Sequence, residues 1–177
     1  NEKFFDDWSH DLKWGIHQAR CVVGHNLKVA WNLTRMHSLM PKESYKTFAH
    51  QIADAIPGAG CDTQRGGWYD MMERTLKDGE ENYRRVWHDR KAWWQQEQGI
   101  LAYYIMAGVY DDKPEYLNYA REGSAFYNGW FLDYEEGGIY FNVLANGQPY
   151  SLGSERGKGS HSMAGYHSFE LCFLSAV

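Results

Sequence analysis

The chain has 177 residues, of which 44% are hydrophobic and 16% aromatic, a composition typical of a folded globular domain. Its formal charge of -5 and the absence of any Lys/Arg run argue against nucleic acid or an anionic membrane as a partner. No apolar stretch is long enough to span a membrane. Three widely spaced cysteines, an odd number, argue against a disulfide framework and favour a cytoplasmic location. We expect one domain over residues 1–177, with no metal or other cofactor.

The predicted elements follow the spacing of apolar residues along the chain. After an extended lead-in at 4–20, helices that are apolar on most sides alternate with helices that are apolar on one side. The first kind is predicted at 24–41, at 93–109 and from 164 onward, and the second kind at 43–56 and 114–132. A short strand or hairpin is predicted at 68–73, and a hairpin with an Asn-Gly turn at 139–149. We interpret the alternation as an inner and an outer set of helices.

Two sequence patterns return at nearly equal intervals. The segment around His25 has counterparts around Gln95 and His167, at steps of 70 and 72 residues. The glycine pair at 66–67 likewise returns at 137–138. A fixed period predicts repeated units arranged as a stack or a ring. The sequence therefore predicts an all-α fold, an incomplete (α/α)6-barrel-like toroid of helical hairpins with short β-hairpins at one end. The last helix lacks a stop signal, so we expect part of a longer toroid.

Three segments resemble landmarks of the N-acylglucosamine 2-epimerase family, which includes cellobiose 2-epimerases and aldose-ketose isomerases. They are Gly24-His25, Trp93-Trp94-Gln95-Gln96 and Tyr166-His167, in family order and spacing. The resemblance covers nearly the whole chain but only the C-terminal part of the family's (α/α)6 barrel. It implies that His25 and His167 are acid/base groups that face a sugar from the starts of inner helices, and that Trp94 stacks against the sugar. For both Trp93 and Trp94, packing in the core is an equally good interpretation.

The two histidines fit the chemistry of a sugar epimerase. Epimerisation next to a sugar carbonyl removes a proton and returns it to the other face, so it needs two groups on opposite sides. Imidazoles suit both tasks because their ordinary pKa is about 6.5. His25 and His167 are therefore predicted to move the C2 proton of an aldose or N-acyl-hexosamine through an enediolate. Lys28, Gln95 and Gln98 are candidate hydrogen-bond donors to that enediolate.

Charged positions near the histidines depart from the family pattern. Three residues beyond the histidines, the family typically has Glu where this chain has Lys28, and often Arg where it has Glu170. We expect Lys28 and Glu170 to approach each other across the pocket as an ion pair of reversed sense. Lys28 would favour neutral His25 and Glu170 would favour charged His167, which divides the pair into base and acid. Gln98 stands where the family has an acid.

Two other functions stay open. A six-hairpin toroid can support glycoside hydrolysis or polysaccharide elimination, and hydrolysis needs two carboxylates about 5 to 10 Å apart. Candidates for these carboxylates are Glu97, Asp133, Glu136 and Glu170. The chain could instead be a non-catalytic carbohydrate-binding or structural piece. In either case an open half-ring exposes apolar surface of its inner helices, so we expect association with a second copy or with another chain.

Overall fold

The structure is a computed structural model that describes residues 20–73, 78–81, 90–159 and 163–176. The lead-in predicted at 4–20 lies outside these ranges except for its last residue. The helices are α3 (Val23–Leu39), α4 (Glu43–Ala55), α5 (Pro57–Gly60), α6 (Trp93–Val109), α7 (Glu115–Trp130) and α8 (Tyr166–Ala176), with a 3-10 turn η1 (Gly153–Glu155). The strands are β1 (Arg20–Val22), β2 (Met71–Glu73), β3 (Lys91–Ala92) and β4 (Asn142–Val143). The four long helices predicted from periodicity up to α7 are all confirmed within a few residues.

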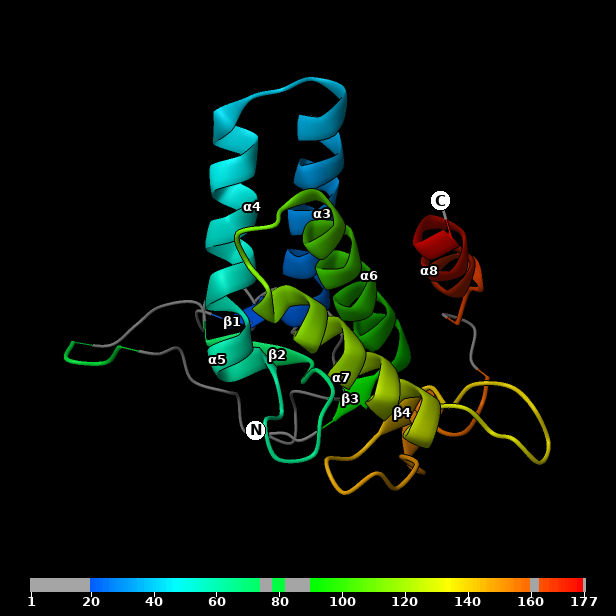
Figure 1. The fold of residues 1–177 in the computed structure, drawn as a ribbon. Helices are drawn as coiled ribbons and strands as arrows, with labels where there is room; N and C mark the ends of the chain where they lie inside the picture. The colour runs from blue at the N-terminus through cyan, green and yellow to red at the C-terminus, as the bar shows by residue number, and fades with distance from the viewer. Residues whose placement is uncertain (1–19, 74–77, 82–89, 160–162, 177) are drawn as a thin grey trace.

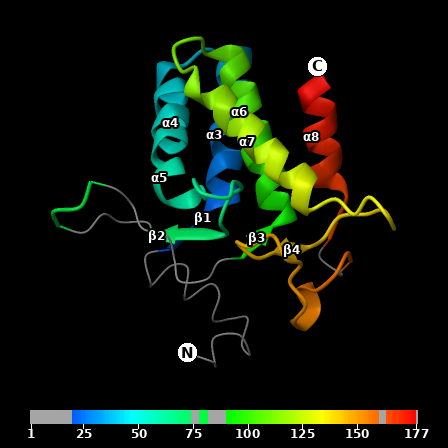
Figure 2. The ribbon, with the colours of Figure 1, turned by 60° about the horizontal axis from the view of Figure 1, so that its bottom comes forward.

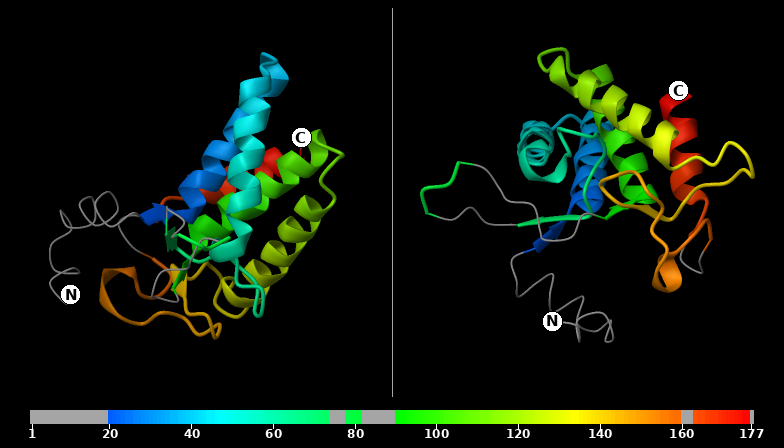
Figure 3. Two further views of the ribbon diagram at one scale, coloured as in Figure 1. Left: turned by 90° about the vertical axis from the view of Figure 1, so that its left-hand side faces the viewer. Right: turned by 90° about the horizontal axis from the view of Figure 1, so that it is seen from below.

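The long helices are arranged as an inner row with an outer cover. Helix α3 packs against α4, and α6 packs against α7, while α6 also packs against α3 on one side and α8 on the other. Figure 1 shows the two helical hairpins side by side, with α8 beyond α6. The view from below in Figure 3 shows that the row curves but does not close within the described residues. The predicted incomplete toroid of helical hairpins is therefore confirmed.

Helix α8 is less covered than predicted. In Figure 2 it stands on the far side of α6 from α3 and α4. His167 is its only buried residue, while Phe169 is 70% and Phe173 is 54% exposed. The prediction of a helix buried on most sides is wrong for the described part of the chain, because its one substantial helix neighbour there is α6.

The four short strands pair with partners far away in the sequence. Strand β1 pairs with β2, and β3 pairs with β4, both antiparallel. Each pair joins the segment that leads into an inner helix to a segment that follows the outer helix. The turn predicted at Asn146-Gly147 is present, since the Leu144 backbone N–H donates to the Gln148 carbonyl at 2.9 Å. Val143 forms an antiparallel bridge with Pro149 across that turn, so the predicted hairpin is present. Its first strand also pairs with β3, and each two-stranded sheet therefore joins the two ends of one helical hairpin.

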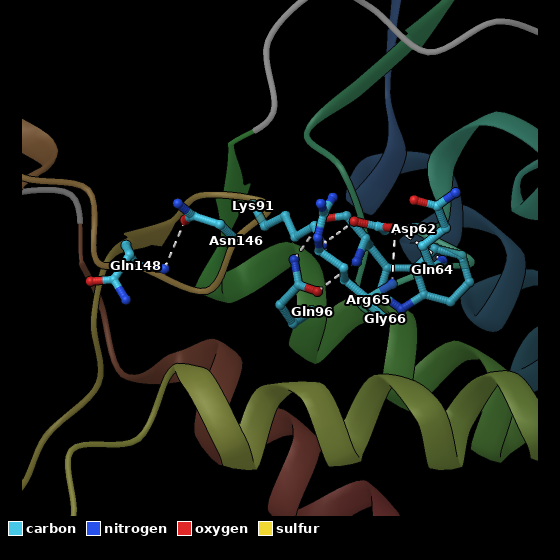
Figure 4. Close-up of polar contacts among 9 residues, drawn as sticks. Asp62, Gln64, Arg65, Gly66, Lys91, Gln96, Asn146 and Gln148 are labelled. Atoms are coloured by element: carbon cyan, nitrogen blue, oxygen red, sulfur yellow. Dashed lines mark hydrogen bonds and ion pairs between the residues drawn. The ribbon is translucent and has the colours of Figure 1, made fainter.

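The repeated glycine pairs belong to two loops of the same design. In the first loop, a carboxylate oxygen of Asp62 accepts hydrogen bonds from the backbone N–H groups of Gln64 and Arg65. Lys91 Nζ donates to Asp62 Oδ2 at 2.8 Å and to the Gly66 carbonyl at 2.7 Å (Figure 4). Both glycines of the pair have positive φ, a conformation that favours glycine. The buried Lys91 side chain therefore holds the loop in this conformation through two hydrogen bonds.

The second loop repeats each of these contacts. Asp133 accepts from the backbone N–H groups of the two residues that follow Tyr134, and Lys158 Nζ donates to Asp133 Oδ2 at 2.8 Å and to the Gly137 carbonyl at 2.9 Å. Both of its glycines also have positive φ. The two lysines differ in burial, because the side chain of Lys91 is 0% exposed and that of Lys158 is 30% exposed. The predicted repeat is confirmed down to single hydrogen bonds.

Candidate active site

The first turns of α3, α6 and α8 bring the predicted site residues together. These turns carry His25, Gln95 and His167 at equivalent positions of the repeat. The ring of Trp94 contacts both imidazoles, with its centroid 4.8 Å from that of His25 and 5.5 Å from that of His167. His25 is exposed, whereas His167 is buried. The two histidines therefore share one site, as their spacing predicted.

The buried Gln95 side chain forms its hydrogen bonds with other residues of the protein. Its side chain is 3% exposed, its Nε2 donates to Asp70 Oδ1 at 3.1 Å, and its Oε1 accepts from the Gly24 backbone N–H at 2.7 Å. A Cβ at Gly24 would lie 2.8 Å from both Gln95 and the ring of Trp94. Gln95 was predicted as a donor to an enediolate, but it instead holds the start of α3, one residue before His25.

A second set of polar residues, Lys28, Gln98 and Glu170, lies about one helical turn beyond the first set on the same three helices. Lys28 Nζ donates to Glu170 Oε2 at 3.0 Å, so the predicted ion pair between them is confirmed. Gln98 Nε2 also donates to Glu170 Oε2, at 3.0 Å, and it approaches His167 Nδ1 at 3.1 Å. Trp31 Nε1 donates to Gln98 Oε1 at 2.8 Å. Gln98 is 0% exposed, so its amide is engaged within the protein and is not available to a substrate.

The surroundings of both imidazoles favour the neutral form. Partial burial and then the positive charge of Lys28 lower the pKa of His25 below its ordinary value. Burial, followed by Lys28, lowers the pKa of His167 to about 4, although Glu170 acts in the opposite direction. The predicted division into a neutral and a charged histidine is therefore wrong, because the desolvation of His167 outweighs its attraction to Glu170.

Two aromatic residues complete the surroundings of the histidines. Trp93 is 3% exposed and packs on Phe141 with ring centroids 4.6 Å apart, so it belongs to the core. The ring of Tyr166 lies 3.8 Å from that of His167, and 5.2 Å separate its centroid from Lys28 Nζ. The role of Tyr166 beside His167 was not predicted from the sequence. The repeat held the signal, because Tyr166 occupies the position that Trp94 has in the preceding unit.

The four carboxylates considered for hydrolysis differ in burial and in hydrogen-bond partners. Glu97 is 0% exposed, accepts hydrogen bonds from two neighbouring hydroxyls and has its pKa raised by burial. Asp133 and Glu136 lie in the second glycine loop, where Lys158 binds the former. Of these four candidates, Glu170 is the one in direct contact with an ion-pair partner at the histidine site.

The described segments contain neither a cluster of metal ligands nor a membrane-spanning helix. Within residues 20–73, 78–81, 90–159 and 163–176, no three His, Cys, Asp or Glu side chains group together as metal ligands. Over the same segments, none of the helices has the length and apolar character that a membrane crossing requires.

Comparison with known proteins identifies the fold. No protein-family model matches the chain, and no curated protein matches it in sequence. A D-mannose isomerase structure superposes with a TM-score of 0.72 at 19% identity, over 89% of this chain and 38% of the isomerase. A cellobiose 2-epimerase from Bacillus thermoamylovorans gives 0.69 at 20% identity, over 90% and 38%. A family 76 glycoside hydrolase from a bovine Bacteroides thetaiotaomicron strain gives 0.64 at 16% identity, over 88% and 30%.

These similarities place the chain among proteins with the (α/α)6-barrel fold of sugar-converting enzymes. More particularly, its fold is that of D-mannose isomerase and cellobiose 2-epimerase, so the resemblance to the N-acylglucosamine 2-epimerase family is confirmed for the fold. The chain spans about 38% of the length of these two proteins.

Proposed function

We propose that this chain carries the acid/base centre of a carbohydrate epimerase or isomerase that acts at C2 of an aldose or N-acyl-hexosamine through an enediolate. The observation that supports it is that His25 and His167 both contact the ring of Trp94 where three helices start. A general base needs a free lone pair, and the surroundings of both imidazoles lower their pKa and so favour the neutral form. Removing a proton next to a carbonyl is the task that such a pair can perform.

The surroundings of the histidines suit a small sugar. Trp94 is partly exposed between the two imidazoles and offers an apolar face to the C–H groups of a sugar ring. Tyr166 is 55% exposed beside His167 and adds a second aromatic surface. Lys28 and Glu170 neutralise each other's charge, which leaves the site without a strong preference for an ionic substrate. We also propose a cytoplasmic location, from the number and spacing of the cysteines.

Glycoside hydrolysis is a weaker proposal for the same fold. It needs a pair of accessible carboxylates that face one bond. Glu97, the acid closest in sequence to the tryptophan pair, is fully buried and hydrogen-bonded. Two imidazoles rather than two carboxylates meet at Trp94, which favours proton transfer at carbon.

The direct test is hydrogen exchange at C2. A panel of aldoses and N-acyl-hexosamines is incubated with the chain in D2O and followed by NMR, using the wild type and the variants His25→Asn and His167→Asn. Loss of a positioned acid/base group is expected to slow exchange by about 10²- to 10⁴-fold. The control is His37→Asn, at the far end of α3, where the imidazole bonds to the backbone of Lys42 and exchange should persist. Sugar binding without exchange in the wild type would instead support a non-catalytic carbohydrate-binding piece.

A further inference from the structure

Gln98 determines which nitrogen of His167 carries a proton. The indole N–H of Trp31 can only donate, so the oxygen of the Gln98 amide must face it, as it does at 2.8 Å. The amide nitrogen therefore faces the other way, and its two hydrogens match two neighbours, Glu170 Oε2 at 3.0 Å and His167 Nδ1 at 3.1 Å. Because Nδ1 faces a donor, it must be the acceptor, and the ring proton of His167 is on Nε2.

We propose that Gln98 is a positioning residue that keeps His167 a neutral Nε2–H donor, so that the chain isomerises an aldose to a ketose with His25 as its one base. This rests on the proposed function and narrows it, since epimerisation by two bases is then disfavoured. The juxtaposition that carries it is the chain of hydrogen bonds from Trp31 through Gln98 to His167.

Two-base epimerisation would require His167 to alternate between two forms that this arrangement opposes. As a base it would need a lone pair on Nε2, which bears the proton. As an imidazolium it would direct an Nδ1–H at the donor N–H of Gln98. Among the charged groups around it, Lys28 opposes the imidazolium and Glu170 favours it, while His25 adds a further opposing contribution. The low pKa of His167 agrees with the geometry.

Among the described residues, no amide is hydrogen-bonded to the His25 ring. Its ring is exposed and contacts Trp94, and Gln95 fixes the backbone beside it through Gly24. Burial and then Lys28 lower its pKa, which favours the neutral form that can accept a proton. His25 can therefore accept a proton, whereas His167 can donate a hydrogen bond. The Gln98 amide sets this difference between the two histidines, and a difference in charge is not needed.

The reaction balances with these two roles. His25 removes the C2 proton of the open-chain aldose, the C2–H electron pair forms the C1=C2 bond, and the carbonyl electron pair moves onto O1. The Nε2–H of His167 donates a hydrogen bond to O1 and keeps its proton. The hydroxyl proton of O2 then passes to O1 within the cis-enediolate, the C2=O2 bond forms, and protonated His25 returns its proton to C1. Both imidazoles end as they began.

The first test reads the tautomer directly and does not need activity. Long-range ¹H–¹⁵N NMR of the ¹⁵N-labelled chain at pH 7 is expected to show His167 protonated on Nε2 alone. In Gln98→Glu a carboxylate faces Nδ1, so the proton should move to Nδ1 or the ring should become doubly protonated. In Trp31→Phe the amide is free to turn, and a mixture of tautomers is expected. Wild-type His167 protonated on Nδ1 would overturn the proposal.

The second test reads the reaction, with folding of each variant checked by circular dichroism. With a [2-²H]aldose the wild type is expected to form ketose before C2 epimer and to carry part of the deuterium from C2 to C1. Gln98→Glu should raise the ratio of epimer to ketose by about 10²-fold or more, the low end for gaining one positioned acid/base group. Epimer as first product, without deuterium transfer, would overturn this inference but leave the proposed function intact. Absence of any exchange at C2 would overturn both, whatever the tautomer.

Discussion

Replacing Lys91 with Met is expected to destabilise the fold far more than replacing Lys158, although the two lysines make equivalent hydrogen bonds. In the first glycine loop, the lysine is 0% and Asp62 is 5% exposed, and their charges meet at 2.8 Å. Burial alone would raise the pKa of Asp62, but hydrogen bonds from Lys91 and Tyr69 hold it below its ordinary value. Removing one partner of a buried ion pair leaves an uncompensated charge and costs about 3–5 kcal/mol.

Lys158→Met is the matched control, because the same contacts occur there at an exposed loop. Water can replace that lysine, so we expect little change in stability. Urea unfolding at pH 7, followed by circular dichroism, measures both variants against the wild type. The double variant Asp62→Asn with Lys91→Met removes both charges and should recover most of the loss, even if Lys91→Met alone does not fold. Equal losses at the two lysines, or no recovery in the double variant, would refute the reasoning.

Three further predictions concern pH and backbone. Lys28→Met removes one cause of the low pKa of His25, so the acid limb of C2 exchange should move to higher pH, and an unmoved limb would contradict this assignment. Burial raises the pKa of Asp70 to about 7, so its contribution to stability is present below about pH 4 and lost as pH rises through 7. Asp70→Asn should flatten this dependence in urea titrations, with a gain at pH 8 of at most about 4 kcal/mol. Gly67→Ala and Gly138→Ala both place a side chain at a positive φ, which should reduce the free energy of unfolding by about 1–3 kcal/mol. The Cβ added at Gly67 also overlaps the Phe126 ring, so Gly67→Ala should have the lower melting temperature.

The helices and the meeting of the histidines could be predicted because both depend on spacing along the chain. Periodicity predicted the inner and outer helices, and the exchange of charges relative to the family pattern led us to expect that Lys28 and Glu170 would pair. The exposure of α8 could not be predicted in the same way. The burial of a helix depends on which elements pack against it, and its apolar sequence does not show that. The pairing of β1 with β2 and of β3 with β4 also escaped prediction, because strands of two or three residues carry little pattern of their own.

The roles of the glutamines could not be predicted for a related reason. Position in the repeat locates Gln95 and Gln98 at the site, but it does not show where an amide points. The Gln95 amide is hydrogen-bonded to Gly24 and Asp70, and the Gln98 amide is hydrogen-bonded to Trp31. These partners come close only in the folded chain. The low pKa of His167 escaped prediction because it depends first on burial, which the sequence does not state.

Lys28, Gln98 and Glu170 form one hydrogen-bonded unit that joins three helices. Glu170 Oε2 receives both the Lys28 ammonium and the Gln98 amide nitrogen, so an anion at 170 demands a cation at one neighbouring position and a neutral donor at the other. An arginine at 170 would instead require acceptors at both. A change of charge at one of these three positions therefore requires matching changes at the other two, each of which lies on a different helix.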